Sequence, residues 1–192
     1  MALDMLIIGL IAVVLILVLI VIMYYNKFVS LNNLAQEDWK QIEPLLQQRL
    51  DTIPNLVATA KGVMKQEKDL FEGISKARES ALSASNMGDK LKANAKVGAL
   101  IGNFIARSEA YPEMKSNANM QMLMEQITGI EEKLKYGRQR YQSTVREYID
   151  ACTLFPGSFF ASGFGFRADK WPYFEADEAA KKAPNVGELL KN

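Results

Sequence analysis

The N-terminal part of the chain holds its longest run of apolar residues, from Met5 to Met23, and no side chain in this run is charged. As a helix it would be about 28 Å long at ~1.5 Å per residue, close to the roughly 30 Å hydrocarbon core of a bilayer. Tyr24, Tyr25 and Lys27 follow, and aromatic and basic side chains favour the membrane–water interface. The pattern predicts a membrane-spanning helix with these three residues at the interface.

A cleaved signal peptide is the alternative interpretation of this run. Such a peptide begins with basic residues, has a shorter apolar segment and ends at a cleavage site of small residues. Here Asp4 precedes the run without any Lys or Arg, and Tyr24 follows it. A retained single-pass anchor, residues 1–27, is therefore preferred. Lys27 and Lys40 follow the span and no basic residue precedes it, which favours a cytoplasmic location for the rest of the chain.

The body of the chain, residues 28–152, has the periodicity of helices. Residues 28–86 place apolar side chains mostly three, four or seven positions apart, without the alternation of a strand. A break is predicted near Gly88, which suits a C-terminal cap, and Asp89, which suits an N-terminal cap. A second helix would run from about residue 90 to 110. A third would begin at Pro112, because the residue before a proline leaves helical geometry. The sequence thus predicts an all-α fold.

The third of these helices has the most regular pattern, with apolar positions alternating three and four residues apart for about four heptads. The positions are Met120, Leu123, Ile127, Ile130, Leu134, Gly137, Tyr141, Val145 and Tyr148. This spacing is typical of coiled-coil-like packing against another helix, and an ordinary bundle core is the preferred interpretation. The charged residues between them are predicted to form a solvated face: Glu131, Glu132, Lys133, Arg138 and Arg140.

Two prolines, Pro44 and Pro54, lie within the helical pattern of residues 28–86. A proline inside a helix removes one hydrogen bond and collides with the carbonyl group four residues earlier, at a cost of about 3 kcal/mol. Two outcomes are open: a helix kinked at both prolines, or a helix broken there. Asp51 and Thr52 can hydrogen-bond locally in the first turn of a restarted helix. In either case we expect a bend that lets the later part pack against its partners.

The C-terminal segment, residues 153–192, differs in character from the body. Residues 155–174 contain eight of the chain's eighteen aromatic side chains, with glycines at 157, 163 and 165. We predict an interaction surface formed by Phe155, Phe159, Phe160, Phe164, Phe166, Trp171 and Phe174. Two interpretations stay open: the segment folds back over its own bundle, or it folds back and also contacts a second subunit. A short helix is predicted at about residues 175–182.

The candidate chemistry of the chain is sparse. It has no histidine, the commonest general acid–base group and metal ligand, and its net charge is +1. There is no P-loop, and Gly163-Phe164-Gly165 lacks the third glycine and the preceding strand of a dinucleotide loop. The single Cys152 is interpreted as a small apolar residue. We therefore predict no catalytic, cofactor-binding or metal site and no nucleic-acid partner.

An ordered set of short motifs from Tyr25 to Val186 resembles the LemA family. The set comprises Tyr25-Asn26, Trp39, the block from Gln48 to Val57, Lys61-Gly62, Glu67, Ala77-Arg78, Glu109-Ala110-Tyr111-Pro112, Met114-Lys115, Glu131, Arg138, Tyr141, Val145, Tyr148, Phe155-Pro156 and Gly165-Phe166. The family favours Tyr-Asn pairs where this chain has Tyr141-Gln142 and Tyr148-Ile149. The resemblance implies a bacterial, membrane-anchored antiparallel bundle of about four helices, without an established catalytic activity. Some relatives are linked to building magnetosome membranes.

Three classes of function follow from these patterns. The favoured one is a structural protein that self-associates through its helical body and organises or shapes the cytoplasmic membrane. Its partners would be the bilayer, through Met5 to Met23, and further copies of the chain. The alternative is a non-enzymatic adaptor that presents its bundle to a membrane signalling or secretion protein, and an enzyme is the least favoured class. A large defined oligomer in detergent would support the first class, and a monomer that captures one partner would support the second.

Overall fold

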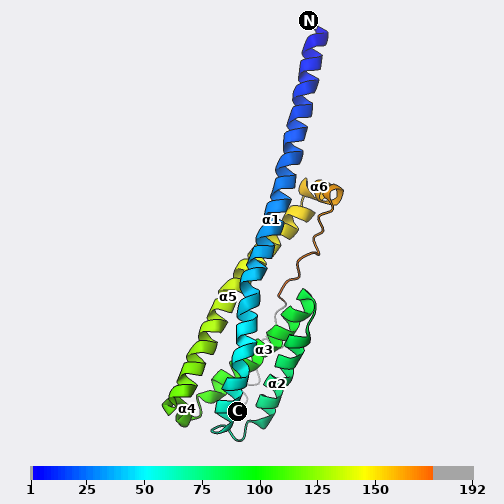
Figure 1. Cartoon of the computed structure of the whole chain (residues 1–192). Helices are drawn as coiled ribbons and strands as arrows, with labels where there is room; N and C mark the ends of the chain where they lie inside the picture. Colours follow the sequence, from blue (N-terminus) through cyan, green and yellow to red (C-terminus); the bar gives the residue numbers. More distant parts are fainter. Residues whose placement is uncertain (1, 175–192) are drawn as a thin grey trace, which may run out of the picture. The chain divides into compact units, whose positions relative to one another are not determined.

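The computed structural model describes residues 2–174, and within them it contains six α-helices and no strand (Figure 1). The helices are α1 (Ala2–Lys61), α2 (Lys68–Ser83), α3 (Met87–Ser108), α4 (Pro112–Ser116), α5 (Ala118–Thr153) and α6 (Gly157–Phe164). Four of them are long and two are short, so the all-α prediction is confirmed. The short helix predicted at residues 175–182 lies outside the described residues.

The chain divides into two compact units, and α1 and α5 each contribute to both. Unit 1 is formed by the described residues up to Gln41 together with Gln139–Pro172. Unit 2 is formed by Ile42–Arg138 together with Tyr173 and Phe174. The segment boundaries that the sequence predicts after residues 27 and 152 stay predictions.

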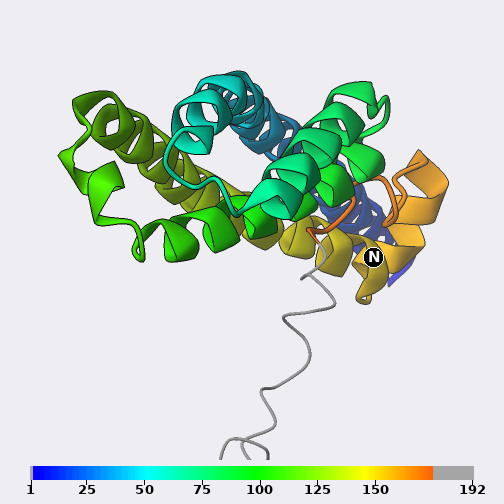
Figure 2. The same ribbon diagram turned by 90° about the horizontal axis from the view of Figure 1, so that it is seen from below.

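The helical segments of unit 2 lie side by side (Figure 2) and contribute to an apolar core. Its fully buried members come from different helices and include Leu56, Ile74, Ile101, Phe104 and Ile127. The rings of α2 and α3 meet within it, with the centroids of Phe71 and Phe104 6.4 Å apart. Apolar faces three and four residues apart on each helix are what such a core requires.

The apolar positions of the heptad pattern predicted along α5 form a buried face. Eight of its nine positions are buried, on both sides of the boundary between the units. The ninth, Gly137, is half-buried, and a Cβ added there would lie 3.1 Å from Cγ1 of Ile42. The glycine therefore lets α1 and α5 approach closely within unit 2.

Three boundaries differ from the predicted ones. A turn between Lys61 and Lys68 interrupts the helical pattern of residues 28–86, and the sequence did not predict it. Met64 is buried within that turn, so the apolar spacing continues without a visible break. The N-cap of α3 is Asn86, not Asp89: Asn86 Oδ1 accepts a hydrogen bond from the Asp89 backbone N–H at 2.9 Å. Gly88 consequently lies in the first turn of α3 and is not a C-terminal cap.

The region after Pro112 is also divided differently. Pro112 begins a helix as predicted, but that helix, α4, ends at Ser116, and α5 begins at Ala118. Asn117 lies between them, and its Oδ1 accepts from the Met120 backbone N–H at 3.1 Å. Asn117 therefore caps the start of α5, as a side-chain acceptor commonly does.

Pro44 and Pro54 both lie inside α1, which continues through them to Lys61. The alternative of a broken helix is therefore wrong. Both proline side chains are exposed, so neither ring occupies the core. The bend at these positions stays a prediction.

Candidate functional site

The N-terminal part of α1 is apolar and exposed on every side. All residues from Ala2 to Leu19 are exposed, and in length and composition this part of α1 could cross a membrane. A helix that is apolar around its whole circumference needs an apolar environment, which a bilayer supplies. The structure thus contains the candidate span that the sequence predicts.

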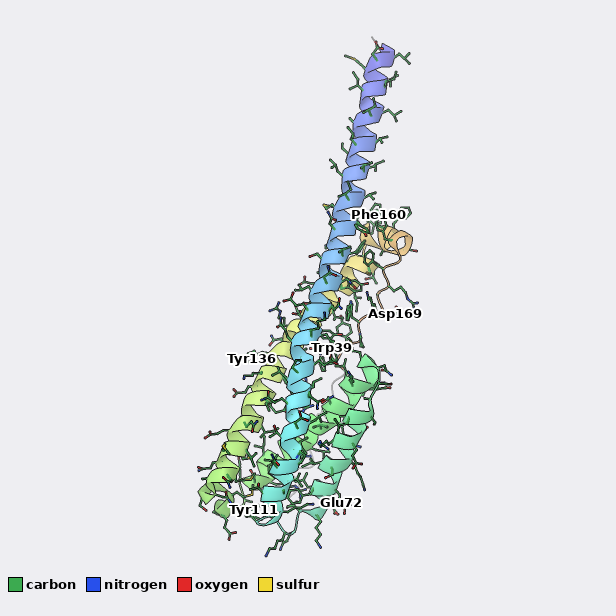
Figure 3. All side chains as sticks on the ribbon, viewed as in Figure 1. Trp39, Glu72, Tyr111, Tyr136, Phe160 and Asp169 are labelled. Atoms are coloured by element: carbon green, nitrogen blue, oxygen red, sulfur yellow. The ribbon has the colours of Figure 1, made fainter. Side chains whose placement is uncertain are left out.

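The three residues predicted for the membrane interface have different surroundings. Tyr24 is half-buried, whereas Tyr25 and Lys27 are exposed. The Tyr24 ring stacks on Phe160 of α6 with centroids 5.3 Å apart, and Tyr25 meets the edge of Phe164 at 5.3 Å. Phe160 is labelled in Figure 3, where α6 lies beside α1. Phe160 and Phe164 are thus placed next to the end of the candidate span.

The seven aromatic residues predicted as one interaction surface fall into separate groups. Phe160, Phe164 and Phe166 pack against Tyr24, Tyr25 and Phe28 of α1, and we call these six residues the aromatic cluster. Trp171 is buried in unit 1. In unit 2, the guanidinium carbon of Arg138 lies over the Phe174 ring, 5.1 Å from the ring centroid. Phe155 and Phe159 are left 88% and 77% exposed, and we call them the exposed pair.

Gly157 is required where the chain turns from α5 into α6. A Cβ there would lie 2.2 Å from the backbone oxygen of Ala151 and 3.4 Å from Cε1 of Tyr24. Gly165 ends α6 with a φ of 76°, in the left-handed region that favours glycine. No atom lies within 4 Å of a Cβ added at Gly163. Of these three glycines, Gly157 is the one that permits a close approach, and this approach brings the start of α6 against α5 and α1 of the same chain.

A buried charge joins three helices in unit 2. Arg49 of α1 is fully buried, and its Nη1 donates to Oε1 of Glu131 on α5 at 3.0 Å. Its Nη2 donates to both the backbone oxygen and Oδ1 of Asn94 on α3, each at 2.7 Å. Asn94 in turn donates from Nδ2 to the backbone oxygen of Lys90 at 2.9 Å. Because the guanidinium is planar with donors in fixed directions, this network specifies how the three helices pack.

A second arginine, Arg138, lies near the same carboxylate. Burial lowers the pKa of Arg49, and Glu131 opposes that shift. Burial also lowers the pKa of Arg138, and the positive charge of Arg49 adds to the effect. Glu131 and Arg138 are both half-buried, so their assignment to a solvated face is wrong. Glu131 is held there by the hydrogen bond that it accepts from the buried Arg49.

Unit 1 has a buried carboxylate of its own. Asp38 of α1 accepts at Oδ2 from the hydroxyl of Thr144 on α5 at 2.6 Å, and its Oδ1 lies 2.7 Å from Nε of Arg140. At the next position of each helix, the rings of Trp39 and Tyr141 are 6.0 Å apart. The Tyr141 hydroxyl donates to the backbone oxygen of Pro172 at 2.9 Å. Arg140 is 56% exposed, so it belongs to the solvated face and also pairs with a buried acid.

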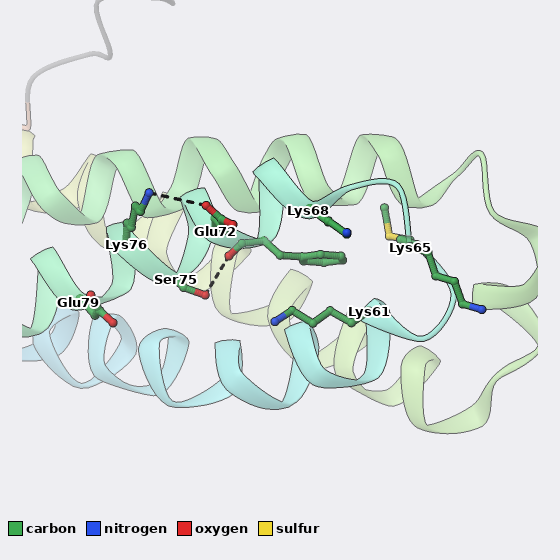
Figure 4. A pocket seen from close by; sticks show the side chains of 9 residues that line it. Lys61, Lys65, Lys68, Glu72, Ser75, Lys76 and Glu79 are labelled. Atoms are coloured by element: carbon green, nitrogen blue, oxygen red, sulfur yellow. Dashed lines mark hydrogen bonds and ion pairs between the residues drawn. The ribbon is translucent and has the colours of Figure 1, made fainter.

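A groove of about 920 Å³ lies at the turn between α1 and α2 in unit 2 (Figure 4). It is lined by Lys61, Met64, Lys65, Lys68, Phe71, Glu72, Ser75, Lys76 and Glu79. Met64 and Phe71 are buried, and Lys76 pairs with Glu72 at 3.8 Å. Lys61, Lys65 and Lys68 are exposed around the opening. The lining thus has four lysines and two glutamates above an apolar floor, and its net positive charge suits an acidic ligand.

Metal-binding clusters and the single thiol can be assessed within residues 2–174. No group of three or more His, Cys, Asp or Glu side chains in this described part of the chain could hold a metal ion. Cys152 is buried, and burial raises the pKa of its thiol, which disfavours the reactive thiolate. The buried polar residues Asp38, Arg49, Asn94 and Thr144 instead form hydrogen bonds between helices.

Sequence reasoning assigned no role to Arg49 or Asp38, although a signal for Arg49 was present. Arg49 lies three residues after Leu46 and four before Ile53, so a charged residue occupies the apolar stripe. A charge at such a position needs a buried partner. The partners could not be deduced, because Asn94 and Glu131 are distant in the sequence.

Comparison with known proteins agrees with the architecture. Residues 38–187 match the model of the LemA family, and both buried polar networks lie within this match. The chain belongs to the LemA family. One curated relative of this LemA-family protein is the magnetosome protein MamQ of Magnetospirillum gryphiswaldense, which is 22% identical. The match covers 76% of this chain and 63% of that protein, so it spans less than two thirds of the relative's length.

Proposed function

We propose that this LemA-family protein is a membrane-anchored structural protein without enzymatic activity. In this proposal its helical bodies associate with one another at the bacterial cytoplasmic membrane and organise or shape it. The observation that carries the proposal is that the exposed apolar span and the wall of the bundle belong to one helix, α1. Because one helix forms both the membrane anchor and part of the bundle, this arrangement suits a protein that holds its bundle at the membrane surface.

The buried polar residues support a structural role. Arg49 and Asp38 are buried, and each is hydrogen-bonded to side chains of other helices. Such networks specify helix packing more than they add stability. The relative MamQ is a magnetosome protein by name, which is consistent with work at a membrane.

Self-association through the helical body is supported by one face of α5 in unit 2. Met122 and Tyr136 are 61% and 71% exposed and lie two heptads apart, so they share a face. Gly129 lies midway, and no atom is within 4 Å of a Cβ added there. Apolar residues at heptad spacing with a glycine between them would let a second helix approach. We call Met122, Gly129 and Tyr136 the outer stripe.

The mass of the detergent-extracted full chain tests this proposal. We expect a defined oligomer by light scattering, and a smaller species with unchanged helicity for M122E combined with Y136E. The control T128E/K135E places two glutamates one heptad apart on another exposed part of α5. Equal mass for wild type and M122E/Y136E would reject the outer stripe, and a monomeric wild type would reject self-association.

An adaptor that presents its bundle to a membrane partner is the second candidate, and the groove between α1 and α2 favours it. Three of its exposed lysines, Lys61, Lys65 and Lys68, would attract an acidic segment of a signalling or secretion protein. A monomeric wild type that retains one such protein, and loses it in K61E/K65E/K68E, would replace the structural proposal by this one.

A further inference from the structure

The exposed pair is unusual among the apolar side chains of this protein. Outside the span, Phe155 and Phe159 are the two most exposed large apolar residues that the structure describes, and their neighbour Leu154 is 62% exposed. One aromatic side chain can bury on the order of 150–250 Å². Two of them beside a leucine therefore reach the few hundred Å² at which an exposed patch indicates a binding surface.

The exposed pair lies level with the end of the candidate span. The Phe159 ring meets Phe160 edge-on at 5.6 Å, and Phe160 stacks on Tyr24 at 5.3 Å. Tyr24 directly follows Met23, the last residue of the span. Phe155 lines a small groove of about 290 Å³ with Tyr24 and Lys27. The pair is thus at the depth where aromatic side chains favour the membrane–water interface.

The backbone around the exposed pair holds it in place. Gly157 seats the start of α6 against Ala151 and Tyr24, with the contacts given above. On the other side Phe166 packs on Phe28, with ring centroids 5.1 Å apart. The aromatic cluster therefore fastens one face of α6 to α1 and leaves the exposed pair on the open side.

We propose that Leu154, Phe155 and Phe159 form a second membrane contact that inserts into the interfacial layer of the same bilayer that the span crosses. The occupant is lipid because the pair is continuous in depth with Tyr24 and the span, where acyl chains and headgroups meet. The nearby groove contains Glu147 and Asp150 as well as Lys27, so its charges do not sum to a positive surface. Binding is therefore hydrophobic and independent of anionic lipid. The inference rests on the anchoring in the proposed function and not on self-association.

Fluorescence quenching in vesicles tests the contact on the full chain. F159W is reconstituted into phosphatidylcholine vesicles, with or without lipids brominated on the part of the acyl chain nearest the headgroup. Trp39 and Trp171 are buried, and the wild-type protein measures their background. We expect brominated lipid to quench most of the emission that F159W adds to the wild-type background. The extent of quenching should be the same when the anionic lipid phosphatidylglycerol is included in the vesicles. F155W repeats the measurement at the other ring.

The matched control is S143W, an exposed position of α5 in the same unit. Its neighbour Thr144 contacts Asp38, which lies roughly 20 Å beyond Tyr24 along α1 at ~1.5 Å per residue. Its added emission should resist the brominated lipid. The inference is overturned if brominated lipid quenches F159W and F155W no more strongly than S143W. If their emission is also blue-shifted, a second copy of the chain covers the exposed pair in place of lipid. Protein that fails to float with the vesicles would overturn the anchoring and this inference together.

Discussion

Arg78 on α2 donates a hydrogen bond from Nε to the backbone oxygen of Leu50 on α1, at 2.8 Å. In an α-helix this oxygen would accept from the N–H of residue 54, and a proline has none. The arginine therefore supplies the donor that Pro54 removes, and it joins α2 to α1 at the same point. The proline and the arginine act as one feature of the fold, although they belong to different helices.

Arg78→Ala is expected to destabilise the protein by about 1–3 kcal/mol, because a partly buried carbonyl loses its donor. Urea unfolding of the full chain in detergent, followed by circular dichroism, measures the change. Lys76→Ala is the control on the same helix. Lys76 is 78% exposed and pairs with Glu72 on its own helix, so its loss should matter little.

Pro54→Ala is expected to reduce the effect of Arg78→Ala, because residue 54 then has an N–H that can bond the Leu50 oxygen. The four proteins form a double-mutant cycle in which the two sites are coupled. If Arg78→Ala destabilises the Pro54→Ala protein as much as the wild type, the guanidinium does not replace the missing donor.

Arg49→Ala is expected to destabilise the protein by about 3–5 kcal/mol, because it leaves Glu131 and Asn94 without their buried partner. Arg49→Lys should recover only part of this loss, since an ammonium group cannot reproduce the fixed donor directions. Arg146→Ala, an exposed position on α5, is the control in the same unfolding assay. Equal stability of the lysine variant and the wild type would show that charge alone suffices at this site.

The stability of unit 1 is expected to fall at high pH because of Tyr148. Burial, with a smaller contribution from Cys152, raises the pKa of Tyr148 from 10.0 to about 12. The unfolded chain then loses this proton at a lower pH than the folded chain, so the contribution is full below pH 10 and is lost as the pH rises to about 12.

Tyr148→Phe removes this titration, so its stability should decrease less than that of the wild type between these pH values. Thermal unfolding of both proteins at several pH values measures the difference. Tyr136→Phe is the control, because Tyr136 is 71% exposed. Parallel pH profiles for Tyr148→Phe and the wild type would contradict the assignment.

The orientation of the chain is expected to place its body in the cytoplasm, because Lys27 and Lys40 follow the span and no basic residue precedes it. A reporter fused after Asn192 that is active only in the cytoplasm should be active. The opposite result, activity of a reporter that works only outside the cytoplasm, would reverse the topology without affecting the fold.

The sequence by itself determined the features that depend on local repetition. The run from Met5 to Met23 predicted a span, since bilayer thickness sets the length of an apolar helix. The heptads from Met120 to Tyr148 predicted the buried face of α5, since 3.6 residues per turn select which side chains share a face. The family match adds that such motifs also identify relatives.

Only the tertiary structure decided the features that join residues distant in the sequence. Arg49 needed Asn94 and Glu131, and the carbonyl left free by Pro54 needed Arg78. The aromatic residues after position 155 resembled one surface in the sequence, yet three of them pack on α1 and the exposed pair does not. Helical period states which residues of one helix share a face. Which helix then covers that face is decided by the packing of all of them, because buried polar groups and close backbone approaches must be satisfied together.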